Sequence, residues 1–491
     1  MSNVPPRPAS GVRIAGDDYQ HLVTWNEVLR GLQPESYVTH ITVEAPDAGN
    51  LDDIVIEHGQ NTATYIQVKH TVDARTPVGS AYLLQAGSGT SKKAKRSLLA
   101  RFRDTDDELR ARGDVEMQLV TDREADPSDP LLSRIDRRTE CLIPAILVAG
   151  LPAAVSTARA QWADHLGVDE DALIALLTDL RIRTGRPYNA EEERAATLMW
   201  GHGLRAGPRA LAVGIAMVRE WVQERQRRRS IDQLRDLIAA RCETADEPGA
   251  VLIVEAIDDD PHPEDATEHL RFVERYAGDD ANSRRELLDA SDWQHVIAPG
   301  IEQAANRLRT SGHRRVVVRG ALRLPMWFAV GAALRHVHGF DVAALQHGTL
   351  WSSQDATGPF PTLNHNVTDI GAGTDLAVAA GVAVDPTSAA ARYINEANLS
   401  VRRLVTLTPP TGPGPQAVQD SPEAARLAVS IRHAVLQELD EHPAERIHLF
   451  LATPGGLALL LGHRWNALRP TVVYEHLGAG RGYVPTVTVS S

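Results

Sequence analysis

Several residue types are scarce in this 491-residue chain, and each scarcity narrows what the protein can be. Two cysteines, Cys141 and Cys242, are too few for a disulfide framework and are typical of a reducing compartment. No run of ~18 uncharged apolar residues occurs, which argues against a membrane-spanning helix. The first residues, MSNVPPRPASG, lack the apolar core of a signal peptide. We therefore expect a cytoplasmic protein with no membrane partner.

Lysine is also scarce, because only four of the 51 Lys and Arg residues are lysines: Lys69, Lys92, Lys93 and Lys95. The net charge of −13 argues against a protein that coats nucleic acid without specificity, although it is compatible with a local basic groove. The length is too great for one hydrophobic core and predicts two or three domains. A lysine kept within the strand-like YIQVKH, in a chain that otherwise uses arginine, calls for an explanation.

The first 149 residues have the pattern of a compact α/β domain. Apolar spacing predicts a helix over 12–32, and strands follow at SYVTHITVEA, DDIVIEH and TYIQVKHT. The last two strands flank HGQN and therefore predict a hairpin that turns near residue 60. A basic helix is expected over 83–113 and a further strand over 115–122.

The remainder divides at about residue 245. Residues 150–245 are rich in Ala, Leu and Arg with helical spacing, which predicts a helical bridge. Residues 246–491 repeat a βαβαβ order twice, including a helix near 264–278, and this order implies parallel sheets. In each half a strand ends at a turn, Arg319-Gly320 or Thr453-Pro454-Gly455, that leads into an apolar helix. Residues 352–401 interrupt the duplication and are expected to cap a ligand pocket or to contact another subunit.

The hairpin brings together a set of side chains suited to phosphodiester hydrolysis. With a turn near residue 60, Asp53 lies opposite Gln67 and Lys69 lies one step further along the same face. A carboxylate with nearby oxygen ligands can hold Mg²⁺ (or Mn²⁺), and a lysine is a compact charge able to stabilise a phosphorane. The alternative is a half-buried strand whose lysine faces water.

Four segments together resemble the PD-(D/E)XK nuclease superfamily: GDDYQ on the first helix, Glu44 at a strand end, then DDIVI and YIQVK. The resemblance implies that Asp53 and the main-chain carbonyl beside Gln67 hold the metal, with Gln67 and Lys69 forming a Q-x-K motif. It implies weaker roles for Glu44 and Gln20. Glu57 becomes the acid if the register slips, and Asp52 remains an alternative.

A basic segment after the hairpin favours nucleic acid as the substrate. Residues 74–103 hold seven cations and no acid: Arg75, Lys92, Lys93, Lys95, Arg96, Arg101 and Arg103. Within GSGTSKKAKRS, a Gly/Ser loop leads into a basic helix and predicts DNA phosphate contacts from Lys92, Lys93, Lys95 and Arg96. The alternative is an ordinary basic helix face.

The C-terminal ~240 residues resemble the SAVED domain, a fusion of two CARF-like, Rossmann-like halves. The resemblance lies in RGALRLPMWFAVGAALRHV, FDVAALQHGTLW and IHLFLATPGGLALLLGHRWNALRPTVVYEH. It implies a sensor for a cyclic di-, tri- or tetranucleotide made by a CD-NTase nucleotidyltransferase. Helix N-termini and aromatic rings suit phosphates and bases, so the predicted ligand contacts are Arg319, Arg323, Trp327, Trp351, Thr453, Pro454 and Gly455, with Tyr474 and His347, near strand ends, as weaker candidates. The alternative for Trp327 is a place in the core.

A PD-(D/E)XK-like domain joined to SAVED resembles the effectors of CBASS anti-phage systems. We therefore expect a double-stranded DNA endonuclease that requires Mg²⁺ and is activated by a cyclic oligonucleotide through homo-oligomerisation. One alternative is a restriction-type nuclease that recognises modified DNA. Another is a non-catalytic nucleotide-binding scaffold.

Overall fold

The computed structural model divides the chain into two compact units, which are described separately. The first contains Met1–Met199 and Leu204–Ala245, and the second contains Trp200–Gly203 and Asp246–Ser491. No helix among the residues described is long and apolar enough to cross a bilayer. The structure describes residues 9–34, 36–46, 48–49, 51–59, 62–71, 76–86, 96–110, 113–136, 139–142, 152–244, 247–346, 348–478 and 480–490.

The first unit is built on a six-stranded mixed sheet of order β5-β4-β3-β2-β1-β6. The strands β1, β2 and β3 run antiparallel, as does the β1–β6 pair, whereas β3, β4 and β5 are parallel. The hairpin predicted from HGQN is confirmed as β2 and β3. The strand bounds are β1 Val38–Val43, β2 Ile54–His58, β3 Thr62–Lys69, β4 Asp114–Thr121, β5 Leu180–Arg183 and β6 Arg228–Ser230.

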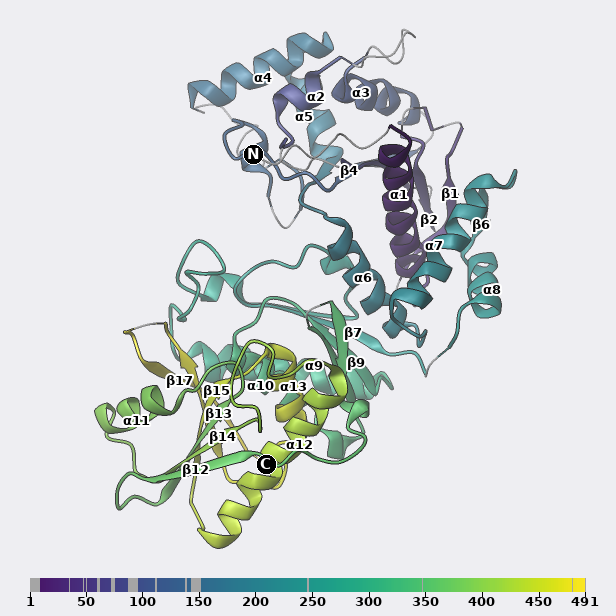
Figure 1. The fold of residues 1–491 in the computed structure, drawn as a ribbon. Helices are drawn as coiled ribbons and strands as arrows, with labels where there is room; N and C mark the ends of the chain where they lie inside the picture. The colour runs from purple at the N-terminus through teal and green to yellow at the C-terminus, as the bar shows by residue number, and fades with distance from the viewer. Residues whose placement is uncertain are drawn as a thin grey trace. The chain divides into compact units, whose positions relative to one another are not determined.

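Helices cover both faces of this sheet (Figure 1). On one face α1 (Ala9–Gly31), α6 (Tyr188–Gly201), α7 (Pro208–Gln223) and α8 (Ile231–Arg241) share a core with β1, β2 and β3. On the other face α3 (Leu98–Leu109), α4 (Ala153–Leu166) and α5 (Glu170–Asp179) share a core with β4 and β5. The sheet is therefore the middle layer of three.

Two predictions for this unit need correction. The helical bridge is not a separate body, because residues 150–245 supply both edge strands, β5 and β6, and helices on both faces of the sheet. The helix expected over 83–113 is instead two shorter ones, α2 (Ser80–Leu84) and α3, and residues 87–95 between them lie outside the described residues. The predicted strand over 115–122 is confirmed as β4.

The second unit contains two mostly parallel sheets. The first has the order β11-β10-β9-β7-β8, and the second has the order β12-β14-β13-β15-β16-β17. The first-sheet bounds are β7 Ala250–Glu255, β8 Glu268–Arg271, β9 Arg315–Arg319, β10 Asp341–Gln346 and β11 Thr349–Ser352. The second-sheet bounds are β12 Asn364–Asp369, β13 Asp375–Gly381, β14 Val401–Thr408, β15 Ile447–Ala452, β16 Thr471–His476 and β17 Tyr483–Val489.

The duplication predicted from the sequence has a geometric counterpart. The helices α10 (Leu324–Ala333) and α13 (Gly455–Arg464) lie side by side with their backbones in contact (Figure 1). A Cβ atom added to Gly331 would lie 2.1 Å from the Leu459 carbonyl oxygen, and one added to Gly462 would lie 2.1 Å from that of Phe328. The two contacts are reciprocal, since one offset of 131 residues relates Gly331 to Gly462 and Phe328 to Leu459. The halves are thus related by a pseudo-two-fold axis at this crossing.

The predicted secondary structure of this unit was wrong in two places. Residues 264–278 form β8 flanked by short 3₁₀ turns rather than a helix, because Glu268–Arg271 pair with β7. Residues 352–401 are not an insertion: they form β12, β13 and α11 (Thr387–Glu396), and β13 is buried in the interior of the second sheet. The remaining helices of the unit are α9 (Ala298–Thr310) and α12 (Ser421–Glu441).

Candidate functional site

The hairpin of the first unit brings Asp53, Gln67 and Lys69 together as predicted. The register pairs Ile54 with Ile66, which sets Asp53 opposite Gln67. The Gln67 side-chain amide donates a hydrogen bond to Asp53 Oδ2. The Val68 backbone N–H donates to the same oxygen at 2.7 Å, and Lys69 Nζ lies 4.0 Å from it.

Burial gives this acid–lysine pair unusual proton affinities. Burial raises the pKa of Asp53 to about 6, although the Lys69 charge and the Val68 N–H oppose the shift. Burial also lowers the pKa of Lys69, although the Asp53 charge opposes that shift. Each group therefore lies closer to its neutral form than it would in water, as is common where side chains take part in catalysis.

Glu44 and Gln20 lie beside this pair. The Gln20 side-chain amide donates a 2.8 Å hydrogen bond to Glu44 Oε1, and the Glu44 charge influences the pKa values of both Asp53 and Lys69. Glu44 has a φ of 46°, a left-handed conformation that is uncommon for a non-glycine residue and recurs at functional sites. Both residues also line a cavity of about 700 Å³ together with Ile14, Asp17, Asp18, His21, Arg219, Val222 and Gln223.

The alternative acids differ in their placement. Glu57 lies at the far end of β2, where Arg228 binds its carboxylate at 2.6 Å and lowers its pKa. Asp52 is adjacent to Asp53, and its charge raises the pKa of Asp53. The register places Asp53, and neither of these two acids, opposite Gln67.

The donor set suits a hard divalent ion with few protein ligands. The described residues contain no group of three His, Cys, Asp or Glu side chains that could hold a metal. Mg²⁺ is commonly held by one or two carboxylates, with waters and substrate phosphates completing its shell. Asp53 and the main-chain carbonyl beside Gln67 fit that pattern, with Glu44 as the nearest further carboxylate.

Arg101 is a candidate that no sequence motif indicated individually. It lies on α3, and its charge lowers the pKa of Lys69, so it lies near the acid–lysine pair. Its Nε is buried without a hydrogen-bond partner, and its side chain has no ion pair among the described residues. An unpaired guanidinium beside Lys69 is suited to a DNA phosphate. The only sequence indication was its place among the seven cations of 74–103.

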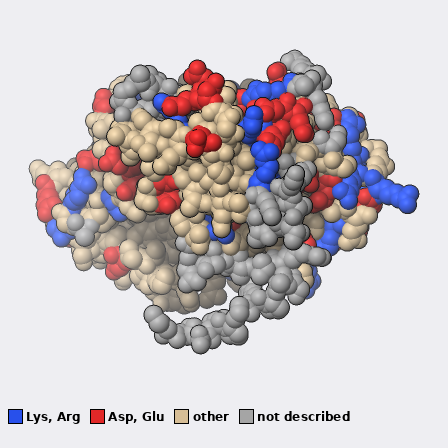
Figure 2. All heavy atoms as spheres, turned by 90° about the horizontal axis from the view of Figure 1, so that it is seen from above, with Lys and Arg blue, Asp and Glu red and all other residues tan. Residues whose placement is uncertain are grey.

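The predicted DNA contacts are only partly visible. Lys92, Lys93 and Lys95 lie outside the described residues. Arg96 is half exposed and forms a 3.0 Å ion pair with Asp104. On the face drawn in Figure 2, acidic and basic side chains alternate in small groups, and no broad basic field covers the described residues there.

Three of the predicted ligand contacts in the second unit are held in its interior. Arg319 donates to Asp260 and Asp265, which ties the 260–265 loop to the end of β9. Trp351 is 1% exposed and packs on Gly456. Tyr474 is 3% exposed, stacks on Phe450 and hydrogen-bonds His448 at 2.7 Å. Both rings are thus covered by the protein in this structure, and Trp351, which was expected to stack on a base, presents no open ring face. His347 lies outside the described residues.

The other predicted contacts lie where α10 and α13 begin. Trp327 packs on Gly455. A Cβ atom added to Gly455 would lie 2.7 Å from the indole nitrogen of Trp327. Thr453 is buried, and its hydroxyl has no partner among the described residues. Pro454 is the N-cap of α13. Arg323, the N-cap of α10, donates to the carbonyls of Ala281 and Arg284.

Arg323 also lines a pocket that sequence reasoning missed. Ten further residues line it, and none of them was predicted: Tyr276, Arg285, Glu286, Leu287, Ala290, Trp293, Glu475, Val484, Pro485 and Thr486. They come from segments that are far apart in the chain. A strand-end glutamate next to an aromatic residue, as in VVYEH, was the only local indication.

Comparison with known proteins identifies residues 298–489, which belong to the second unit. Residues 298–489 match the family model described as "SMODS-associated and fused to various effectors sensor domain", or SAVED. These residues are therefore a SAVED domain, and the resemblance noted in the sequence is confirmed for them. CD-NTase-associated protein 4 from Enterobacter hormaechei subsp. hoffmannii (strain UCI 50) is 24% identical over 188 residues. That match spans 38% of this chain and 37% of the relative's length.

Solved structures of similar proteins include two Cap4 receptors. The Acinetobacter baumannii Cap4 SAVED/CARF-domain containing receptor with the cyclic trinucleotide 2'3'3'-cAAA is 15% identical, with a TM-score of 0.42 and coverage of 100% of both chains. The Moraxella osloensis Cap4 receptor is 13% identical, with a TM-score of 0.40, and the match covers 97% of this chain and 99% of that one.

Proposed function

We propose that this chain is a metal-dependent endonuclease for double-stranded DNA, activated by a cyclic oligonucleotide within a CBASS anti-phage system. The observation that carries the proposal is the convergence of Asp53, Gln67 and Lys69 in a chain that also contains a SAVED sensor domain. The kinship with a CD-NTase-associated protein supports a nucleotidyltransferase as the source of the messenger.

Each residue of the centre has a role that follows from its position. Asp53 and the main-chain carbonyl beside Gln67 would hold Mg²⁺ (or Mn²⁺), which supplies an activated water and charge neutralisation on the phosphate when it is bound. Gln67 holds the Asp53 carboxylate in place through its amide. Lys69 stabilises the negative charge that develops on the phosphoryl oxygens. Arg101 binds a phosphate of the same strand and keeps it beside Lys69.

Control of the centre is assigned to the second unit. A loosely specific nuclease that was always active would cut its host's DNA, so the isolated unit must have low activity. Binding of the messenger would shift the population toward a homo-oligomer in which cleavage is efficient. Light scattering with and without the activating ligand measures that step, and an unchanged particle mass at saturating ligand would contradict it.

The experiment that tests the function is plasmid cleavage by the full chain with Mg²⁺. Reactions contain no ligand or one of a panel of cyclic di-, tri- and tetranucleotides, and Lys69→Ala is assayed in parallel. We expect cleavage with at least one cyclic oligonucleotide, none without it, and none by Lys69→Ala. Cleavage without any ligand would indicate a restriction-type enzyme, and cleavage by Lys69→Ala would place the active centre elsewhere.

A further inference from the structure

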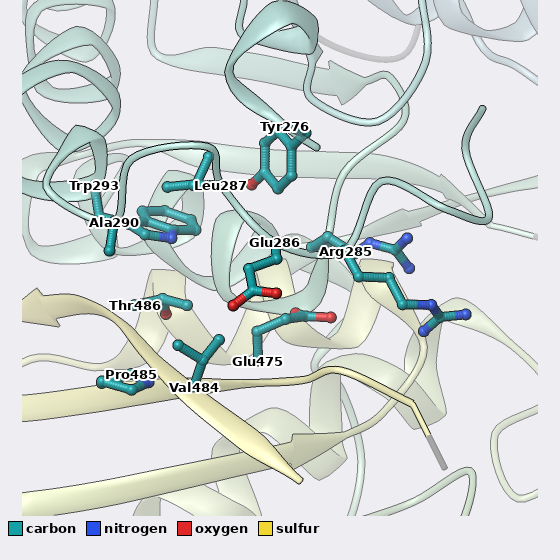
Figure 3. Close-up of a pocket in the computed structure, with 11 residues that line it drawn as sticks. Tyr276, Arg285, Glu286, Leu287, Ala290, Trp293, Glu475, Val484, Pro485 and Thr486 are labelled. Atoms are coloured by element: carbon teal, nitrogen blue, oxygen red, sulfur yellow. The ribbon is translucent and has the colours of Figure 1, made fainter. Parts of the chain in front are cut away.

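The pocket beside Arg323 has the composition of a binding site rather than of a packing defect. The cavity has a volume of about 60 Å³ and is partly open to solvent, so a ligand would extend from it to the surface. It lies where β16 ends and α10 begins, a common location for ligands of α/β proteins. Figure 3 shows Glu475 and Val484–Thr486 on one side, opposite Tyr276, Leu287 and Trp293.

Two polar groups in this pocket lack the partners that buried polar groups normally have. Tyr276 is 5% exposed, and its hydroxyl has no hydrogen-bond partner among the described residues. Glu475 is 8% exposed and has no ion pair or side-chain hydrogen bond among them. Two groups of different chemistry, both unpartnered and from distant segments, converge on one space. That arrangement is expected when a ligand completes their bonding.

The charges around the pocket suit a nucleotide. Burial raises the pKa of Glu475 to about 7, while Arg323 and Arg285 act to lower it. Arg323 is occupied by the carbonyls of Ala281 and Arg284, whereas Arg285 bonds through Nε to Asn282 and its terminal nitrogens have no partner among the described residues. The buried Glu475 carboxyl group can bond to a nucleobase, and the nearby Arg285 guanidinium can bond to a phosphate. Together they can recognise a nucleotide.

We propose that this pocket receives one purine base of the messenger, with Glu475 accepting a hydrogen bond from the exocyclic amino group of that base. Tyr276 bonds to a ring nitrogen, Trp293 packs along the base, and Arg285 binds the adjoining phosphate. The inference rests on the proposed sensor function and adds base selectivity to it. Adenine carries an amino group at C6 and guanine carries one at C2, whereas hypoxanthine has a carbonyl oxygen at C6 and only hydrogen at C2, and uracil has no amino group.

Calorimetric titration of the full chain with cyclic rings of two, three and four nucleotides tests the proposal. The rings are built from adenosine, guanosine, inosine or uridine alone. We expect an adenosine or guanosine ring to bind at least ~100-fold more tightly than its inosine counterpart, because a site built to bond an amino group is left unpaired without it. The better of the two amino purines identifies the base.

Glu475→Gln is the decisive variant because it keeps the shape of the side chain. Its amide donates to a carbonyl as readily as it accepts from an amino group, so discrimination against inosine should fall at least ~10-fold. Tyr276→Phe should weaken binding of the preferred ring about 5- to 10-fold. Glu268→Gln is the matched control, since Glu268 is not part of the pocket lining, forms a 2.8 Å ion pair with Arg307, and the variant should bind as the wild type does.

The outcomes separate the two proposals. Equal binding of inosine and amino-purine rings by the wild type would overturn the base assignment and leave the sensor intact. Unchanged selectivity in Glu475→Gln, measured on protein with a normal unfolding transition, would do the same. If the wild type binds none of the cyclic rings, the sensor function fails and the pocket assignment fails with it.

Discussion

The buried, unpaired carboxyl group of Glu475 should make the unfolding free energy of the ligand-free protein depend on pH. Glu475 has an ordinary pKa of 4.5 and a folded-state pKa of about 7, raised by burial. The folded state therefore holds its proton more tightly than the unfolded state. Between pH 4.5 and 7 the unfolded chain ionises first, so Glu475 destabilises the fold progressively as the pH rises through this window.

The size of the effect follows from the shift. A displacement of about 2.5 units at about 1.36 kcal/mol per unit gives a loss of about 3 kcal/mol between pH 4.5 and pH 8. Glu475→Gln keeps the shape and removes the titration. We therefore expect the variant to match or slightly trail the wild type at pH 4.5 and to exceed its stability by about 3 kcal/mol at pH 8.

Denaturant unfolding of the full chain at a series of pH values measures this difference. Subtracting the wild-type from the variant free energy at each pH removes the contributions that both proteins share. Glu286→Gln provides the control, because its carboxylate is half exposed and paired with Arg481. Parallel pH profiles for wild type and Glu475→Gln would refute the reasoning, since they would mean that Glu475 titrates alike in both states.

Three further variants test the catalytic centre and the core. Lys69→Arg should lower ligand-activated plasmid cleavage about 100-fold, because a planar guanidinium cannot take the place of a compact ammonium 4.0 Å from Asp53; full activity would exclude Lys69 from the chemistry. Arg101→Gln should weaken DNA binding and reduce the slope of log affinity against log salt by about 1. Arg110→Gln is the control and should leave that slope unchanged, because the Arg110 guanidinium is paired with Asp106 and Asp179. Equal slopes for Arg101→Gln and the wild type would contradict a phosphate contact by Arg101. Gly331→Ala should lower the free energy of unfolding by about 3 kcal/mol, since its Cβ would lie 2.1 Å from a backbone carbonyl oxygen. Gly414→Ala is the control, because a Cβ atom there would have no neighbour within 4 Å. Equal stability of the two variants would contradict the close helix crossing.

The β2–β3 hairpin could be predicted because its information is local. Alternation with a period of two and a short turn fix which residues oppose each other, so Asp53 and Gln67 were paired correctly from the letters alone. The start of α13 after Thr453-Pro454 was predictable for a similar reason, since a proline followed by an apolar run marks a helix start.

The errors arose where tertiary pairing decides the structure. The strands β5 and β6 have four and three residues within Ala- and Arg-rich segments, and they become strands because the sheet edges offer them partners. Residues 268–271 fall within the helix predicted near 264–278, yet they pair with β7. The pocket was missed because its walls come from 276–293, from Arg323 and from 475–486, and no pattern in the sequence joins these segments.

The internal duplication has a consequence for how a ring-shaped messenger is seated. The offset that relates α10 to α13 also relates Glu475 to Ala344, a buried residue of β10, so the acid occurs in one half only. A homodimer of single halves would offer a symmetric ring two equivalent seats and could not tell them apart. Here the two halves are joined in one chain and differ in sequence, so the two seats are not equivalent. A ring of identical nucleotides would then be held in one orientation, with one of its bases chemically singled out from the others.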